Sequence, residues 1–348
     1  MTFEKISIGH MEKCYSLALL EYNRKKHIIV GPEKVNKCLM YNLDGVLEET
    51  IWENTGGVMS IVPLPGTNGQ FLATQEFYSP NDSKEAKIIH ISPSCGGKWH
   101  IRDIVRLPFV HRFDILSSNG AYYLIACTLK SDHTGKDDWS SPGKVYAIRL
   151  PEDLNALPEY AIWDLDIIQG GLLRNHGYYK LSRNGKESAV VSCEQGVFHF
   201  MPPDGTSGHW EVKKLISDPA SDALFLDIDN DGEDELITLS PFHGDTITFY
   251  KKTNEKFEKV SIYKEKLEFL HALYGGVISG KPVFITGCRK GRMDLLAFVF
   301  NSLDDYEVIT IDQNCGSANV LRFNDNGKDF LVSANRETDE IAIYRLNY

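Results

Sequence analysis

The sequence contains no long apolar run and no excess of basic residues, and each absence excludes a class of protein. No stretch approaches the roughly 18 consecutive apolar residues of a transmembrane helix, so we expect no membrane span. The first ten residues lack the apolar core of a secretory signal, which favours a cytoplasmic protein. The formal net charge is −11, whereas a surface that follows nucleic-acid phosphates needs clustered Lys and Arg. We therefore expect neither a membrane nor a nucleic acid as a partner.

Paired cysteine motifs and long capped helices are missing as well. The seven cysteines are an odd number, and no two of them have the CxxC spacing of metal or redox sites. This usage fits reduced thiols in a cytoplasmic protein. No segment has the pattern of a long capped amphipathic helix, apart from one candidate helical turn within 151–157. The expected fold class is therefore all-β.

What the sequence does contain is one arrangement that occurs seven times. Each copy has an apolar strand, a turn, a return strand, a polar loop and a third strand, at a period of roughly 45 to 65 residues. Turns of the Asn-Gly type separate the first two strands, as at Asn119-Gly120 and Asn326-Gly327. Short strands repeated in this way are typical of four-stranded propeller blades. The first strands of the seven copies are expected at residues 15–20, 58–62, 112–116, 178–181, 223–226, 273–278 and 319–323.

The two ends of the chain complete this count. Residues 3–8 form an alternating strand with no partner nearby in sequence, and the last copy ends with its third strand at 341–345. We expect 3–8 to supply the missing outer strand of the last blade, because ring closure removes an exposed sheet edge. The sequence therefore predicts a single domain, residues 1–348, folded as a seven-bladed β-propeller that is closed by its N-terminal strand.

Four of the 11 histidines fall where the repeat brings residues to one mouth of the central channel. His111, His176 and His271 precede the inner strands of blades three, four and six, and His243 lies in a loop of blade five. One such histidine is usually an ordinary hydrogen-bonded residue, but the repeat makes these four converge. Neutral imidazole binds first-row metal ions and also titrates near neutral pH. We predict that His176, His243 and His271 hold a divalent ion, Zn²⁺ or Mn²⁺, and that His111 is a general base.

Polar residues in neighbouring loops are candidates for substrate binding. Glu76, Tyr78, Glu194 and Arg289 lie after the return strands of their blades, at the same expected face as the histidines. Each could bind a substrate hydroxyl or assist a leaving group. The alternative for each residue is ordinary solvated loop polarity.

An acidic run marks the first turn of blade five. Asp227, Asp229 and Asp231 precede Gly232 with the spacing of a calcium-binding loop. The run is not an EF-hand, because Thr238 stands at the twelfth place and no helices flank it. A structural Ca²⁺ is one interpretation, and a tight turn with solvated carboxylates is the other. In both cases the run is expected on the face opposite to the histidines.

Two sets of motifs resemble known families. Residues 227–235, Asp-Ile-Asp-Asn-Asp-Gly-Glu-Asp-Glu, resemble the FG-GAP or VCBS propeller repeat. Residues 175–177 (Asn-His-Gly), 193–196 (Cys-Glu-Gln-Gly) and 241–244 (Pro-Phe-His-Gly) are similar to the propeller domain of the aldos-2-ulose dehydratase (1,5-anhydro-D-fructose dehydratase) family. The second resemblance implies the metal-assisted elimination of water from a keto sugar.

Two functions follow from these observations. The first is a metal-dependent carbon–oxygen lyase that acts on a small carbohydrate, either a keto sugar or an oxidised glycoside. The second is a non-enzymatic propeller whose face binds a protein or a glycan. A WD-type scaffold is disfavoured because Trp-Asp and Gly-His signatures do not recur once per blade. The metal content of the purified protein would separate the two functions.

Overall fold

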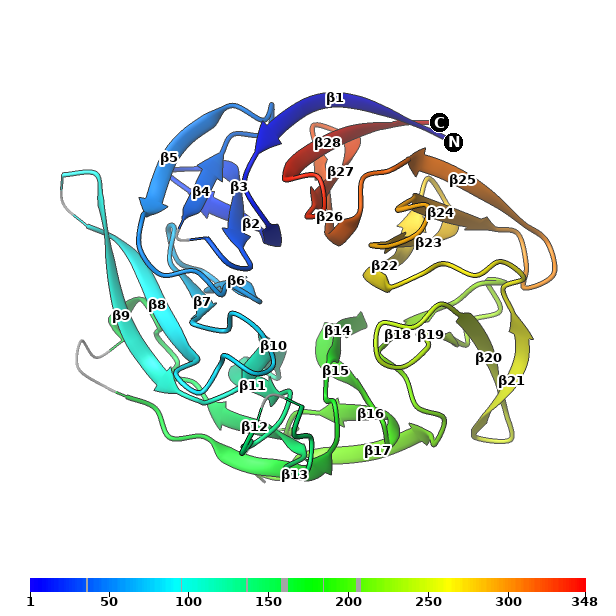
Figure 1. Cartoon of the computed structure of the whole chain (residues 1–348), viewed down its shortest axis with the longest axis horizontal. Helices are drawn as coiled ribbons and strands as arrows, with labels where there is room; N and C mark the ends of the chain where they lie inside the picture. The colour runs from blue at the N-terminus through cyan, green and yellow to red at the C-terminus, as the bar shows by residue number, and fades with distance from the viewer. Residues whose placement is uncertain (36, 95, 136, 158–161, 184, 205–207) are drawn as a thin grey trace.

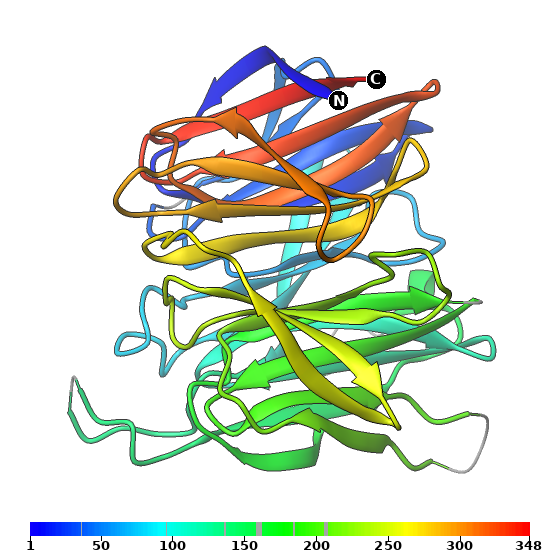
Figure 2. The same ribbon diagram turned by 90° about the vertical axis from the view of Figure 1, so that its right-hand side faces the viewer.

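The computed structural model describes the whole chain except residues 36, 95, 136, 158–161, 184 and 205–207. In the described residues, seven four-stranded antiparallel sheets surround a central axis as the blades of a β-propeller (Figure 1). Figure 2 shows the same ring from the side. The described helical structure is one short 3-10 turn, η1 (Leu154–Ala156), within the predicted segment 151–157. The predicted fold class and blade number are confirmed.

The strands of each blade follow one another in sequence from the centre of the ring to its rim. Blade one contains β2 (Cys14–Tyr22), β3 (Lys25–Pro32), β4 (Cys38–Tyr41) and β5 (Leu47–Trp52). Blade two contains β6 (Ile61–Pro63), β7 (Phe71–Gln75), β8 (Lys87–Ser94) and β9 (Lys98–Arg106). Blade three contains β10 (Val110–Ser118), β11 (Ala121–Thr128), β12 (Gly143–Arg149) and β13 (Asp166–Leu172). Blade four contains β14 (Gly177–Arg183), β15 (Lys186–Cys193), β16 (Gly196–Met201) and β17 (Glu211–Ile216).

The remaining blades have the same order. Blade five contains β18 (Asp222–Leu226), β19 (Glu235–Leu239), β20 (Ile247–Thr253) and β21 (Lys256–Ile262). Blade six contains β22 (Leu270–Ile278), β23 (Lys281–Cys288), β24 (Leu295–Phe300) and β25 (Tyr306–Asp312). Blade seven contains β26 (Ser317–Asp325), β27 (Lys328–Asn335), β28 (Glu340–Asn347) and, at its rim, β1 (Thr2–His10).

Blade seven closes the ring with both ends of the chain. Strand β1 pairs antiparallel with β28, with Phe3 opposite Leu346 and Ile8 opposite Ala342, and Figure 1 shows the two termini side by side. The Lys5 ammonium group also lies 2.5 Å from the Asp312 carboxylate of blade six. The predicted closure by residues 3–8 is confirmed.

The core lies between adjacent blades, so the second strand of each sheet is covered on both faces. All five residues of β7 and all five of β19 are buried. A strand covered on both faces has an uninterrupted apolar sequence rather than an alternating one. Two-residue turns connect the first two strands of blades one, three, six and seven, and Asn119 and Gly120 both adopt positive φ, at 47° and 80°, as a type I′ turn requires.

Blade two departs from the predicted strand boundaries. The sequence predicts a strand over 58–62, but β6 begins only at Ile61. The Thr74 hydroxyl oxygen accepts hydrogen bonds from the backbone N–H groups of Met59 (2.5 Å) and Ser60 (3.0 Å). A side chain thus takes the place of strand pairing at this point, which shortens the strand.

Two further expectations concern unpaired cysteines and the absence of a membrane-spanning helix. All six cysteines that the structure describes are buried and unpaired, and burial raises the pKa of the Cys14 thiol to about 12. Across the described ranges, no helix is long and apolar enough to cross a membrane. The cytoplasmic location stays a prediction.

Candidate metal centre

Three of the predicted histidines occupy the same place in their blades. Each follows, by two residues, a residue whose backbone has left-handed φ: Phe109 (63°) before His111, Arg174 (50°) before His176, and Phe269 (62°) before His271. This backbone conformation is uncommon for residues other than glycine. Its recurrence shows that one local geometry brings the chain into the inner strand of several blades.

A β-bulge then directs two of these side chains. The pairing of β10 with β11 shifts between Val110 and Arg112, and the pairing of β22 with β23 shifts between Leu270 and Ala272. His111 and His271 are thus the extra residues of two equivalent bulges. Bulges re-aim side chains, and here both imidazoles are buried within one group of histidines.

His243 reaches the same place by a different route. It lies in the loop between β19 and β20, with a left-handed φ of 56°. Its ring stacks on Phe269, with 4.3 Å between the ring centroids and an interplanar angle of 7°. The His243 ring is also nearly parallel to that of His271, at 5.2 Å. Blade six therefore supplies both the support and the neighbour of a histidine from blade five.

The structure brings the four predicted histidines together. The His176 ring lies 4.5 Å from the ring of His243, 4.7 Å from that of His111 and 5.5 Å from that of His271. One ligand nitrogen from each of His176, His243 and His271 lies within 4.8 Å of the other two. These are the three residues that the sequence predicts as ligands. Metal binding itself stays a prediction.

Hydrogen bonds to the backbone orient two of the rings. Nδ1 of His271 lies 2.5 Å from the carbonyl oxygen of Ala318, and Nδ1 of His176 lies 3.2 Å from that of Ser221. Because a carbonyl oxygen only accepts, each Nδ1 carries the proton and each Nε2 has an acceptor lone pair, which in His271 faces the Tyr15 hydroxyl at 3.0 Å. Histidine ligands of metals commonly use their second nitrogen in this way. Nε2 of His243 is 3.0 Å from Nε2 of His176, so both nitrogens face the same point.

The environment of His111, His243 and His271 favours their neutral form. Burial lowers the pKa of His111, His243 and His271 well below its usual range, and nearby cationic groups, including Arg112, lower it further. Neutral imidazole is the form that binds metals, so the predicted ligands His243 and His271 are ready to bind an ion at neutral pH. His111 has a further property. Its buried Nδ1 has no hydrogen-bond partner among the described residues, as a base that awaits a substrate proton would require.

Tyr15 and Arg112 belong to the site but are missed by the sequence-based prediction. The Tyr15 hydroxyl lies 3.0 Å from Nε2 of His271 and 3.3 Å from a terminal nitrogen of Arg112. Tyr15 occupies a bulge of β2 that is equivalent to those of His111 and His271. Alignment of the first repeat with the third would have found Tyr15. A search restricted to histidines could not.

A narrow cavity of 190 Å³ continues from this group along the channel. Residues from the inner strand of every blade line the cavity, and His271, Arg112 and Asp222 are among them. The Asp222 carboxylate also lies 3.2 Å from Nδ1 of His176. The histidines therefore border a polar space that a small ligand could enter.

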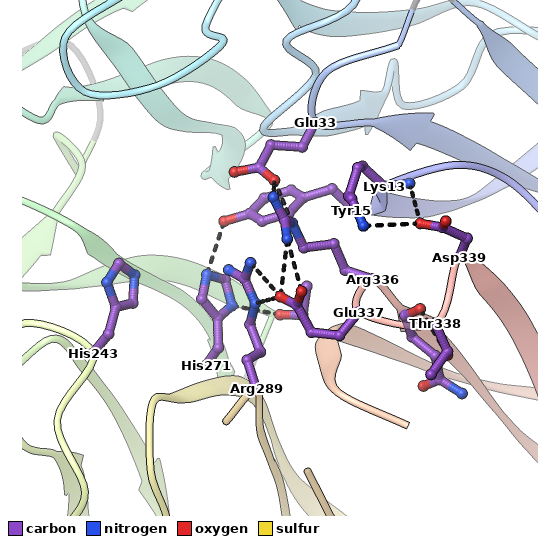
Figure 3. A network of polar contacts seen from close by, with 12 residues as sticks. Lys13, Tyr15, Glu33, His243, His271, Arg289, Arg336, Glu337, Thr338 and Asp339 are labelled. Carbon is purple, nitrogen blue, oxygen red and sulfur yellow. Dashed lines mark hydrogen bonds and ion pairs between the residues drawn. The ribbon is translucent and has the colours of Figure 1, made fainter. Parts of the chain in front are cut away.

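Arg289 lies at the edge of the histidine group, within a network of ion pairs (Figure 3). Its guanidinium group lies over the Phe269 ring, 4.9 Å from the centroid. Nε and one terminal nitrogen donate to Glu337, at 2.9 and 2.7 Å. Arg336 also binds Glu337, and it links this pair to Glu33 of blade one. Arg289 is thus held rigidly beside the site.

The other predicted substrate-binding residues lie farther out. Glu194 accepts a hydrogen bond of 2.8 Å from Arg174, which lies over the Phe242 ring next to His243. Glu76 pairs with Lys87 at 3.4 Å and, together with Tyr78, lines a separate pocket between blades two and three. The structure therefore does not bring Glu76 and Tyr78 into the histidine group.

The acidic turn of blade five gathers a different set from the predicted one. Oxygens of Asp227, Asp229 and Glu235 lie within 4.8 Å of one another, so buried Glu235 takes the predicted place of Asp231. The Lys251 ammonium group lies 2.6 Å from Asp229 and 3.1 Å from Asp231. A lysine therefore supplies positive charge where a Ca²⁺ would bind. The calcium site stays a prediction.

Comparison with known proteins supports the fold and no finer assignment. No protein-family model and no curated protein matches the chain, so the resemblances to FG-GAP or VCBS repeats and to aldos-2-ulose dehydratase stay predictions. The Cps50 (Swd1) β-propeller domain of Myceliophteria thermophila is similar in structure, with a TM-score of 0.60 and 8% sequence identity over 99% of this chain and 100% of that one. The Dos1 propeller has a TM-score of 0.57 and 8% identity over 99% of this chain and 95% of that one. At this identity the likeness shows a shared propeller fold.

Proposed function

We propose that the protein is a metal-dependent carbon–oxygen lyase that eliminates water from a keto sugar or an oxidised glycoside. The observation that supports this proposal is the convergence of His176, His243 and His271 from three successive blades. Three histidine ligands suit Zn²⁺ and related ions, and a three-ligand site leaves a position open for a substrate oxygen. When bound, such an ion would polarise the sugar ketone and so acidify the neighbouring C–H bond.

The residues around the site would divide the remaining work. His271 and His176 are oriented by carbonyl oxygens, so their rings need no rotation to present Nε2, although the Tyr15 hydroxyl would have to leave Nε2 of His271. His111, neutral and buried, would take the proton from the carbon next to the ketone. The bond between the β-carbon and its hydroxyl oxygen would then break, and the hydroxyl would leave as water after gaining a proton. This elimination requires no oxidant or reductant.

Alanine variants of the four histidines (His111, His176, His243 and His271) test the proposal. Purified protein is expected to carry roughly one transition metal ion, and His243→Ala should lose both the ion and the elimination activity. His111→Ala should keep the ion and lose rate by roughly 10²- to 10⁴-fold, the usual contribution of a general base. The measurements are metal analysis and rates of water elimination from a 2-keto sugar, whose C4 hydroxyl is β to the ketone, with all four variants. Full activity in all four would refute the lyase, and loss of the ion from His111→Ala would reassign that residue as a ligand.

The second candidate is a non-enzymatic propeller that binds a partner on the histidine-bearing face. Aromatic and cationic side chains alternate around the mouth, because Arg174 lies over the rings of Trp139 (5.2 Å) and Phe242 (5.6 Å), and Arg289 lies over Phe269. Arginine and aromatic residues are enriched at interaction hot spots. The likeness to two structures described as propeller domains, with no enzymatic activity in their names, supports this candidate rather than the first.

Metal content separates the two candidates. A partner-binding face would retain its affinity after the ion is removed by a chelator, and Trp139→Ala would weaken binding of the partner. A lyase would lose its activity on chelation and regain it when Zn²⁺ or Mn²⁺ is restored.

A further inference from the structure

A second pocket opens between blades two and three, apart from the histidine group. Its volume is 690 Å³, within the range of roughly 300–1,000 Å³ that is usual for small-molecule sites. One wall is the loop that follows β7, with Glu76, Tyr78 and Ser83, and the other is the loop that follows β11, with His133. Two loops from different blades therefore enclose one polar space.

The first wall of the pocket is held in place by hydrogen bonds. The backbone N–H of Tyr78 donates to the carbonyl of Asp82 at 3.0 Å, and the N–H of Phe109 in blade three donates to the carbonyl of Ser83 at 2.8 Å. The ammonium group of Lys130, which is fully buried, donates to the Asn81 side chain at 3.2 Å. The pocket is thus preformed rather than a gap between mobile loops.

Two polar atoms in the lining lack a partner. Ser83 is 1% exposed, and neither its hydroxyl oxygen nor the buried Nδ1 of His133 has a hydrogen-bond partner among the described residues. Buried polar groups in proteins are almost always hydrogen-bonded. Two unpaired groups in one pocket therefore point to a ligand that supplies their partners.

The chemistry of the lining selects the class of ligand. The carboxylates of Glu76 and Asp82 accept hydrogen bonds, the Ser83 hydroxyl can donate or accept, and the Tyr78 ring offers an apolar edge. The lining has three carboxylates, with Glu85 as the third, against the single ammonium group of Lys84, so it disfavours a phosphate or another anion, whereas adjacent donors and acceptors suit the hydroxyls of a sugar. We propose that this pocket binds a neutral saccharide ring.

The position of the pocket suggests its relation to the metal centre. Phe77 lies between the lining residues Glu76 and Tyr78 in sequence, and its ring contacts His111 at 5.0 Å between centroids. One loop therefore serves both sites. The role of the pocket as a subsite for a further sugar unit rests on the proposed lyase function, but saccharide binding itself does not.

Direct binding measurements on the full chain test this inference. Cellobiose and glucose are titrated by calorimetry and by saturation-transfer NMR, and cellobiose is expected to bind. Ser83→Ala and His133→Phe should each raise the dissociation constant by about three- to tenfold, the usual effect of removing one hydrogen bond. Ser83→Ala should not lower the melting temperature, because the hydroxyl has no hydrogen-bond partner in the described part of the chain. Ser182→Ala, on an exposed position of β14, is the control and should not change binding.

A metal-site variant separates this inference from the proposed function. His243→Ala, treated with a chelator, should bind cellobiose as the unmodified protein does. Loss of cellobiose binding in that variant would place the sugar in the channel and overturn the pocket assignment. The absence of binding to either sugar, or unchanged affinity in both Ser83→Ala and His133→Phe, would also overturn it. If the unmodified protein is purified without a stoichiometric transition metal and still binds cellobiose through Ser83, the lyase alone is refuted.

Discussion

Replacement of His111 by glutamine should reduce the pH dependence of stability by a calculable amount. His111 is buried, and its burial together with the neighbouring His176 holds its pKa well below the ordinary value near 6.5. In the unfolded chain the same imidazole binds a proton at about pH 6.5. The unfolded state therefore binds more protons than the folded state below this pH. The resulting stability is fully present above pH 6.5 and is lost as the pH falls toward the folded-state pKa.

The magnitude follows from the linkage between proton binding and folding. One such histidine lowers the free energy of unfolding by about 1.4 kcal/mol when the pH falls from 7.5 to 5.5. His243 and His271 have depressed pKa values for the same main reason, burial, so the three together account for about 4 kcal/mol. This is a large part of a typical total stability of roughly 5–15 kcal/mol.

Urea unfolding of the metal-free protein at pH 7.5 and pH 5.5 measures this effect. The difference between the two free energies should be smaller by about 1.4 kcal/mol in His111→Gln than in the unmodified protein. A packing defect caused by the substitution lowers the free energy of unfolding equally at both pH values, so it cancels in the difference. Carboxyl groups that titrate equally in both proteins cancel when the two differences are compared. Phe113→Leu, which perturbs the same strand without removing a titrating group, is the matched control and should leave the difference unchanged. An unchanged difference in His111→Gln would refute the neutral, buried state of this imidazole.

Three further predictions concern the ring, the acidic turn and Tyr15. Deletion of residues 1–10 exposes the edge of β28 and should lower the melting temperature by at least about 5 °C, and equal melting would contradict closure by β1. Lys251→Met removes the ammonium group from between Asp229 and Asp231. The variant should bind Ca²⁺ at least about tenfold more tightly in calorimetry, because a competing positive charge is gone. Equal Ca²⁺ affinity would count against a cation position at this turn. Tyr15→Phe frees Nε2 of His271, so Zn²⁺ affinity measured against a competing chelator should not fall; a fall would show that the hydroxyl supports the site.

The sequence predicts those parts of the fold that follow from the same physical rule in every blade. Second strands covered on both faces give apolar runs, and Asn119-Gly120 and similar pairs give the turns, so blade number and order could be counted. The same counting places His111 and His271 at equivalent positions before the structure is known. The repeat accounts for the convergence of His111 and His271, whereas His243 also needs its own loop conformation.

The parts that the sequence does not predict depend on individual side chains and on unusual backbone angles. Glu76 adopts a left-handed φ of 62°, which is rare for glutamate, and its side chain pairs with Lys87 and lines the separate pocket. No local pattern signals that conformation, so Glu76 and Tyr78 are predicted in the wrong neighbourhood. The pattern of apolar residues also cannot predict that the Thr74 hydroxyl accepts the hydrogen bond of the Met59 N–H in place of strand pairing.

The orientation of the histidines links the metal centre to the closure of the ring. Nδ1 of His271 in blade six is held by the carbonyl oxygen of Ala318 in blade seven, and blade seven is completed by β1. The Asn319 side chain of blade seven also donates to the Tyr15 carbonyl in blade one, at 2.9 Å, across the junction on the other side of blade seven. Loosening of blade seven would therefore release His271 as well as destabilise the fold. We expect the protein without residues 1–10 to bind Zn²⁺ more weakly than the full chain at a temperature at which both are folded, as measured by competition with a chelator. Equal Zn²⁺ affinity would show that the blades hold their histidines independently of closure.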